Sequence, residues 1–135
     1  MQTRFALSLH DNVALRQIYN VVARRIGTTD ATVTTAVTIP LANADSIVLF
    51  SVLWRGIDAA HNMVLRESTF VLRRIDTAGP TQLGSTVDLI ATVKDDAGVG
   101  TPSFAISGNN ALLQVTGKAS TNYTWDVEAT WRELF

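Results

Sequence analysis

The sequence predicts an all-β fold, an antiparallel β-sandwich of jelly-roll-like type with seven or eight strands. After residue 27 the chain is rich in Thr, Val, Ile and Ala, is interrupted by Gly, Pro and Asn, and has no convincing helical stretch. From Tyr123 to Trp131 the odd positions are apolar and the even positions polar, which is the period of a strand with one buried face. Segment 46–56 is apolar on both faces, as in a strand covered from two sides.

Composition restricts the function classes. A chain of 135 residues is large enough for one domain with its own core. Charged residues make up only 17%, below the roughly 25% typical of soluble domains, which suggests that partners cover part of the surface. The net charge of −1 argues against nucleic acid as a partner. The chain has no cysteine, which excludes disulfides, thiolate metal sites and cysteine nucleophiles.

No segment of the sequence looks like a membrane span or a signal peptide. The longest near-apolar run, residues 47–54, is far shorter than the roughly 20 residues that a transmembrane helix needs. The N-terminus lacks a hydrophobic region of signal-peptide length. We therefore expect a soluble protein that is made inside the cell and has no membrane partner.

The first 27 residues are interpreted as an N-terminal arm or assembly segment, and residues 28–135 as the sandwich domain. Residues 4–9 alternate in the manner of a strand. Residues 11–26 fit a helix capped by Asp11 or Asn12, with an apolar stripe. They also fit a strand, because Val21 and Val22 are β-branched. Both alternatives stay open for this segment.

The sandwich domain divides into strands at its Gly, Pro and Asn turns. The expected strands cover residues 28–39, 46–56, 66–76, 85–95, 103–107, 111–117 and the closing segment 121–135. Residues 57–65 are expected to be a connection. The sequence Gly-Asn-Asn at 108–110 fits a tight hairpin, since these residues tolerate positive φ. The last three strands are expected to form an antiparallel meander.

The sequence contains no catalytic, cofactor or metal-binding motif, and we expect no enzyme. His10 and His61 lie far apart and outside any metal-ligand spacing. Asp95 and Asp96 could supply oxygen ligands to Ca²⁺, but the other positions of a calcium loop are missing, which favours a solvated turn. A glycosidase needs two facing carboxylates. The carboxylates considered for that role are Glu67, Asp76, Asp88, Asp126 and Glu128, with the last two interpreted as structural on a solvated face.

Aromatic and arginine residues are the candidates for a core or an interface. Three tryptophans could form a sugar-stacking platform, but aromatics that alternate with Val and Ala more often pack in a core or a subunit interface. The adjacent pairs Arg24-Arg25 and Arg73-Arg74 fit either a charged subunit interface or an exposed edge. The core and interface candidates are Phe50, Trp54, Arg73, Arg74, Tyr123, Trp125 and Trp131.

Three quoted stretches resemble a small β-sandwich domain of virion structural proteins in tailed bacteriophages. They are "TTDATVTTAVTIPL" (28–41), "FVLRRI" (70–75) and "DDAGVGTPSFAISGNNALLQVTGKASTNYTW" (95–125). The resemblance covers roughly residues 28–132. Its pattern consists of a Thr-Thr-Asp-Ala-Thr opening, a strand ending in Ile-Pro, then Ser-Gly-Asn, Val-Thr-Gly and a final Asn and Trp.

The resemblance implies a domain of the kind found on tail fibres and other appendages, here nearly free-standing. It implies a non-enzymatic virion protein that decorates the capsid or belongs to the tail as a fibre or adaptor component. Its partners would be further copies of itself, for instance in a trimer, and other virion proteins. The alternative is a carbohydrate-binding or host-receptor-binding module, whose ligand would be a glycan on the host surface.

Overall fold

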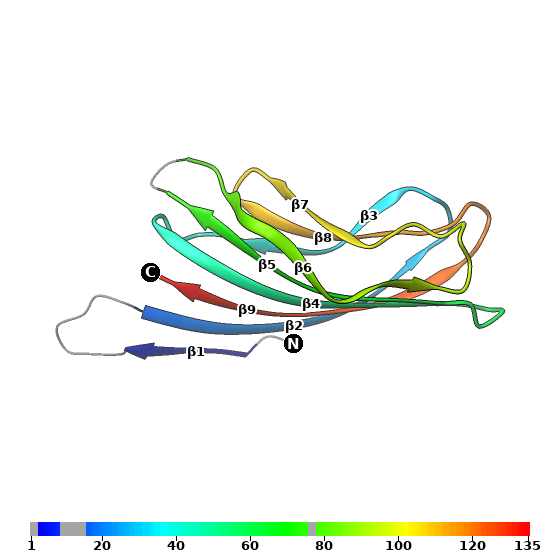
Figure 1. Cartoon of the computed structure of the whole chain (residues 1–135), viewed down its shortest axis with the longest axis horizontal. Coiled ribbons are helices and arrows are strands. Elements are labelled where there is room, and N and C mark those ends of the chain that lie inside the picture. Colours follow the sequence, from blue (N-terminus) through cyan, green and yellow to red (C-terminus); the bar gives the residue numbers. More distant parts are fainter. Residues whose placement is uncertain (1–2, 9–15, 76–77) are drawn as a thin grey trace.

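The protein is a two-layer antiparallel β-sandwich, which confirms the predicted fold class (Figure 1). The computed structural model describes residues 3–8, 16–75 and 78–135. Within them lie nine strands, more than the seven or eight expected. One sheet has the order β1-β2-β9-β4-β5-β6 and the other β3-β8-β7. The strands are β1 (Thr3–Ser8), β2 (Arg16–Thr28), β3 (Val33–Pro40), β4 (Ser46–Asp58), β5 (Met63–Arg74), β6 (Thr81–Lys94), β7 (Ser103–Ser107), β8 (Asn110–Thr116) and β9 (Tyr123–Leu134).

The alternation in the last segment predicts β9 correctly. From Tyr123 to Trp131 every odd residue is buried, whereas Thr124, Glu128 and Arg132 on the other face are exposed. The strand lies between β2 and β4 and pairs with each of them over 12 residues. It is therefore central to the large sheet, with its aromatic face toward the core.

The ambiguous N-terminal segment is a strand from Arg16 onward. β2 pairs with β9 along its length, and Val22 is buried in the core. The backbone N–H and C=O groups of β9 on this side need hydrogen-bond partners, which a neighbouring strand can supply and a helix cannot. This explains why the segment is a strand, an alternative that periodicity left open. Residues 9–15, with the proposed helix caps and His10, lie outside the described residues. The division after residue 27 stays a prediction, and β2 runs across it to Thr28.

The expected meander of the last three strands is wrong. β7 and β8 form the predicted hairpin, but β8 pairs on its other side with β3, and β9 belongs to the large sheet. Gly117 follows β8 at a point where a Cβ would lie 2.4 Å from the Thr28 hydroxyl oxygen, so the chain turns there against the end of β2. From that turn it crosses to the other layer. Crossings of this kind also join β2 to β3, β3 to β4 and β6 to β7, which gives the jelly-roll-like path.

Several strand boundaries differ from the expected ones because turn chemistry is local. β5 begins at Met63 and the connection before it shrinks to residues 59–62. Asp58 makes this tight turn possible, since its carboxylate accepts hydrogen bonds from the backbone N–H groups of Ala60 and Asn62. His61 has a φ of 66° at this turn. Likewise, the strand expected over 28–39 begins only at Val33, after a turn in which Asp30 accepts from the Thr32 N–H.

The core lies between the two sheets and contains a row of stacked aromatic rings. Trp131, Phe50 and Phe70 come from the adjacent strands β9, β4 and β5, with ring centroids 6.1 Å and 4.9 Å apart. Phe104 of the small sheet stacks on Phe70 at 3.8 Å and so joins the two layers. Burial of such rings supplies much of the driving force for closing a sandwich.

Candidate assembly surface

The side chains that point away from the core form a regular array on the outer face of the large sheet. Strands β2, β9, β4, β5 and β6 are paired in register, so residues opposite one another share a face and form rows across the sheet. The "hydroxyl row" contains Val21, Thr130, Ser51, Thr69 and Val87. The "arginine row" on one side of it contains Tyr19, Arg132, Leu49, Val71 and Leu83. The "glutamate row" on its other side contains Ala23, Glu128, Leu53, Glu67 and Ile90.

No described element covers this outer face, on which aliphatic side chains lie between hydroxyl and charged groups. Six of the ten exposed large hydrophobic residues of the described chain belong to it. They are Val21, Ile47, Met63, Leu83, Val87 and Val93. Several exposed aliphatic side chains on one uncovered sheet face are the kind of surface that an interaction partner can bury.

β4 shows the difference between the two faces within one strand. Val48, Phe50, Val52 and Trp54 are at most 2% exposed, whereas Ile47 is 40% exposed and Leu49 and Leu53 are half-buried. The sequence predicted cover on both faces, either by two layers of the same domain or by a second sheet and a neighbouring subunit. The first alternative is wrong, because the small sheet covers the inner face alone. The neighbouring subunit stays a prediction.

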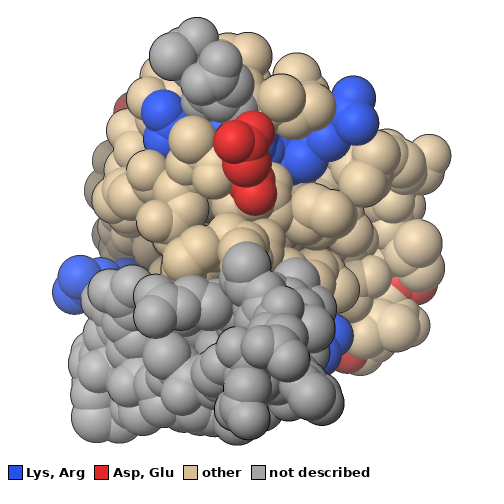
Figure 2. Space-filling view, turned by 90° about the vertical axis from the view of Figure 1, so that its left-hand side faces the viewer, with Lys and Arg blue, Asp and Glu red and all other residues tan. Residues whose placement is uncertain are grey.

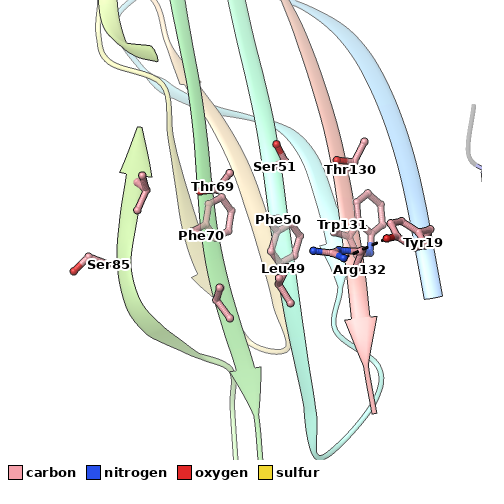
Figure 3. A pocket seen from close by; sticks show the side chains of 12 residues that line it. Tyr19, Leu49, Phe50, Ser51, Thr69, Phe70, Ser85, Thr130, Trp131 and Arg132 are labelled. Atoms are coloured by element: carbon pink, nitrogen blue, oxygen red, sulfur yellow. Dashed lines mark hydrogen bonds between the residues drawn. The ribbon is translucent and has the colours of Figure 1, made fainter. Parts of the chain in front are cut away.

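A shallow groove of about 400 Å³ lies in this face where the arginine and hydroxyl rows meet (Figure 3). The Arg132 guanidinium donates a 3.2 Å hydrogen bond to the Tyr19 hydroxyl oxygen and lies 5.6 Å from the centre of the Tyr19 ring. Thr130, Ser51 and Thr69, on the successive strands β9, β4 and β5, line the same groove. The groove thus combines an aromatic ring, a cation and hydroxyls on a wall of aliphatic side chains.

Two ion pairs on the outer face hold adjacent strands together. Arg25 of β2 contacts Asp126 of β9 at 2.8 Å, and Arg55 of β4 contacts Glu128 of β9 at 2.8 Å. The hydrogen bond from Arg25 lowers the pKa of Asp126, with its positive charge adding to the effect. Both pairs are solvent-exposed, so each contributes little to stability. Figure 2 shows the left-hand end of the molecule, where most of the described surface belongs to uncharged residues.

The predicted core and interface residues fall into two groups. Five of them are buried in the core of the single chain: Phe50, Trp54, Tyr123, Trp125 and Trp131. Arg73 is exposed on the outer face, and Arg74 points the other way and donates to the Leu41 carbonyl oxygen at 2.7 Å. A tryptophan platform for sugars has no exposed tryptophan to build on, because all three are at most 7% exposed.

The outer-face aliphatics of β6 were missed by sequence reasoning. Val87 and Val93 alternate with polar residues in the strand expected over 85–95, whereas Leu83 falls in segment 77–84, which the Gly-Pro signal predicts to be a turn. In the structure β6 is the last strand of the large sheet, and most of it is exposed. The unusual feature was the absence of any aromatic residue in this strand, which contrasts with β4, β5 and β9.

The carboxylates considered for catalysis or metal binding have structural partners. Asp88 accepts hydrogen bonds from the Ser68 hydroxyl at 2.5 Å and from Arg66, and the Ser68 bond is the main cause of its lowered pKa. Asp96 pairs with Lys118, and Asp95 accepts from the Met63 N–H. Asp76 lies outside the described residues. Among the described residues there is no group of three or more His, Cys, Asp or Glu side chains that could hold a metal ion.

Comparison with known proteins finds one weak structural similarity. No protein-family model matches the sequence, and no curated protein matches it significantly. One similar solved structure is that of gp49, a tailspike protein from the Acinetobacter baumannii bacteriophage Fri1 that is a capsular polysaccharide depolymerase. The match is 16% identical with a TM-score of 0.42, and covers 84% of this chain and 17% of the tailspike chain. A similarity this weak assigns no function to this chain.

Membrane insertion by a helix finds no support in the described part of the chain. It contains no helix long and apolar enough to cross a bilayer.

Proposed function

We propose that this chain is a non-enzymatic structural protein of a tailed-phage particle, which assembles on the capsid or tail through the outer face of its large sheet. The virion assignment rests on the sequence resemblance over residues 28–132. The assembly role rests on one observation above all, the uncovered apolar face made by β2, β9, β4, β5 and β6. A sandwich that already has a closed core has no need of that face for its own folding.

Immunogold electron microscopy of purified particles, with antibody raised against the recombinant chain, tests this proposal. We expect gold label on intact particles, either spread over the head, as for a decorating protein, or confined to the tail, as for a fibre or adaptor. Antibody that detects the chain in infected cells but leaves purified particles unlabelled would contradict the proposal. Label on particles that lack the gene for this chain would reveal cross-reaction and serves as the control.

A second candidate function is glycan binding, which the groove beside Tyr19 favours. Aromatic rings stack on sugar faces, and the neighbouring hydroxyl and guanidinium groups could bond to sugar hydroxyls. This candidate replaces the tryptophan platform, since no tryptophan is exposed. It would make the chain a host-receptor-binding module.

Saturation-transfer NMR with oligosaccharides from the host surface separates the two candidates. Glycan binding predicts signal transfer to the sugar, its loss in Tyr19→Ala and its survival in Tyr19→Phe, which keeps the ring. Absence of transfer with the wild-type chain would exclude a glycan ligand among the sugars tested. Equal loss in both variants would point to a role of the Tyr19 hydroxyl in placing Arg132 and not to ring stacking.

A further inference from the structure

We propose that the partner of the outer face is the same face of a second copy of this chain, related by a two-fold axis that runs along the hydroxyl row. The inference rests on the proposed assembly role of this face and names its occupant. Two large sheets would then lie face to face as in an aligned sandwich, about 10 Å apart. The complex would have four layers, with the two small sheets outermost.

The outer face is large enough for a stable dimer. Its five strands, at a spacing of about 4.8 Å, and its paired length of about ten residues give a face of roughly 24 by 35 Å. That is about 800 Å² per partner, the amount that a standard stable interface buries. The face has aliphatic side chains across its middle and charged groups in defined rows, in keeping with the anatomy of such interfaces.

One pair of charges on the face is complementary under this symmetry, and its Glu128 also binds Arg55 within its own chain. A two-fold axis along the hydroxyl row exchanges the rows on either side, so the arginine row of one copy lies over the glutamate row of the other. Arg132 then faces the second copy's Glu128, and this contact occurs twice. In the same register Leu49 faces the second copy's Leu53. On β5 the same register places Glu67 opposite the second copy's Val71, so the charge match is made at Arg132 and Glu128.

The row on the axis is also suited to meeting its own copy. Ser51, Thr69 and Thr130 carry hydroxyls that both donate and accept, so each can pair with an identical group. At the two ends of this row Val21 is 44% exposed and Val87 is 58% exposed. Two copies of these valines would bury each other without leaving a polar group unpaired.

The edge of the sheet is a poorer place for a second copy than its face. β6 pairs with β5 through three register shifts, and Gly84 within it has a φ of 76°. Bulges of this kind twist an edge strand away from regular pairing with another chain. We therefore assign contact between copies to the side chains of the face and not to the backbone of β6.

Sedimentation velocity of the chain over a concentration series tests the proposal with two matched variants. The wild type should form a species of twice 14.6 kDa. Val87→Lys places two like charges together at the axis and should raise the dissociation constant at least about tenfold. Val33→Lys is the control, because Val33 is 55% exposed, against 58% for Val87, but belongs to the small sheet. A wild type that stays monomeric, or equal effects of both variants, would overturn the proposal.

A charge swap tests the register. Arg132→Glu and Glu128→Arg should each weaken the dimer by about fivefold, because each removes two symmetry-related ion pairs and adds repulsion. The double variant should recover most of the wild-type affinity. Thermal unfolding of each variant at low concentration controls for damage to the monomer. A double variant weaker than either single one, or a wild-type trimer that the swap does not affect, would refute the two-fold arrangement.

The two proposals fail separately. A chain that is monomeric in solution but labelled on particles would refute the dimer and leave the virion assignment standing. If Val87→Lys disrupts a dimer but antibody does not find the chain on particles, the dimer would stand and the virion assignment would be refuted.

Discussion

The two faces of the large sheet are built from the same strands but from different side chains. On the inner face Trp131, Phe50 and Phe70 stack in a row, whereas Thr130, Ser51 and Thr69 of the same strands face outward. Large rings make contacts that only a closed core can satisfy, while hydroxyls and aliphatic side chains tolerate both water and a partner. The comparison indicates that one face stabilises the chain and the other is available for association.

Removal of residues 1–27 should have the largest effect, because it takes most of β2 from both faces at once. β9 would lose 11 of its 12 pairs with β2, since Thr28 remains, and Val22 would leave the core. We expect loss of the cooperative unfolding transition in circular dichroism, because β9 and the core would be exposed on that side. Removal of residues 1–8 is the control, since β1 pairs with β2 alone and the transition should persist. A sharp transition in the longer truncation would show that β2 is dispensable.

Substitutions at two neighbouring positions of β4 compare the contributions of the inner and outer faces to stability most directly. Phe50→Ala removes a 2% exposed ring and should lower the free energy of unfolding by about 3–5 kcal/mol. Leu49→Ala, one residue earlier on the outer face, should cost about 1 kcal/mol or less in the monomer, because this side chain is only half-buried. Urea titration at low protein concentration measures both. Similar losses at the two positions would remove the distinction between the faces.

Gly56, near the other end of β4, tests how tightly the inner face is packed. The Trp125 indole lies over this glycine, and a Cβ there would be 2.7 Å from a ring carbon. Gly56→Ala should therefore lower the free energy of unfolding by about 1–3 kcal/mol through overpacking. Gly27→Ala in β2 is the matched control, as its Cβ would meet nothing closer than 3.8 Å and the change should be nearly neutral. The prediction fails if the two substitutions cost the same in a urea titration.

Acid should produce the smallest effect. It should distinguish Asp88, which accepts from the buried Ser68 hydroxyl, from Asp126, which accepts from the exposed Arg25 guanidinium. The pKa values of Asp88 and Asp126 are lowered from 3.8, mainly by hydrogen bonds from Ser68 and Arg25 respectively. Their contribution is present above pH 3.8 and is lost as the pH falls through the lower pKa values of the folded state. The free energy of unfolding should thus decrease below about pH 4.

Salt and two substitutions separate the contributions of these carboxylates. Arg25→Ala should flatten the acid dependence only at low ionic strength, because its pair with Asp126 is exposed and screened by salt. Ser68→Ala should flatten it at low and high salt alike, since Ser68 is fully buried. Urea titrations between pH 2 and 6 would measure both slopes. Identical salt dependence in the two variants would contradict this assignment.

Much of the fold could be predicted because local patterns carry it. The alternation from Tyr123 to Trp131 identifies a strand and its buried face, and the Gly-Asn turn at 108–110 identifies the β7–β8 hairpin. Local patterns do not say which strand pairs with which. For that reason the sheet that β9 joins was predicted wrongly, and segment 11–26 fitted two kinds of structure equally well.

The candidate site was harder to predict than the fold. An apolar residue such as Val87 has the same sequence signature whether its face meets the core or water. Only the position of β6 as the last strand of the large sheet leaves Val87 uncovered, and that position depends on pairing between distant segments. The resemblance to virion proteins rests on a pattern of turns and strands, and such a pattern does not identify which face of a sheet a partner covers.

The placement of β9 between β2 and β4 has a consequence for how the chain acquires its structure. Arg25 and Asp126, which lie opposite each other in the sheet, are 101 residues apart in sequence. During synthesis, β2 and β4 therefore leave the ribosome long before β9. Until β9 is made, the edges of β2 and β4 that pair with it have no partner. Topologies dominated by such distant contacts fold on the millisecond to second timescale. We expect the β4–β5 hairpin, whose connection is short, to form early and the pairing of β9 with β2 and β4 to complete the large sheet last.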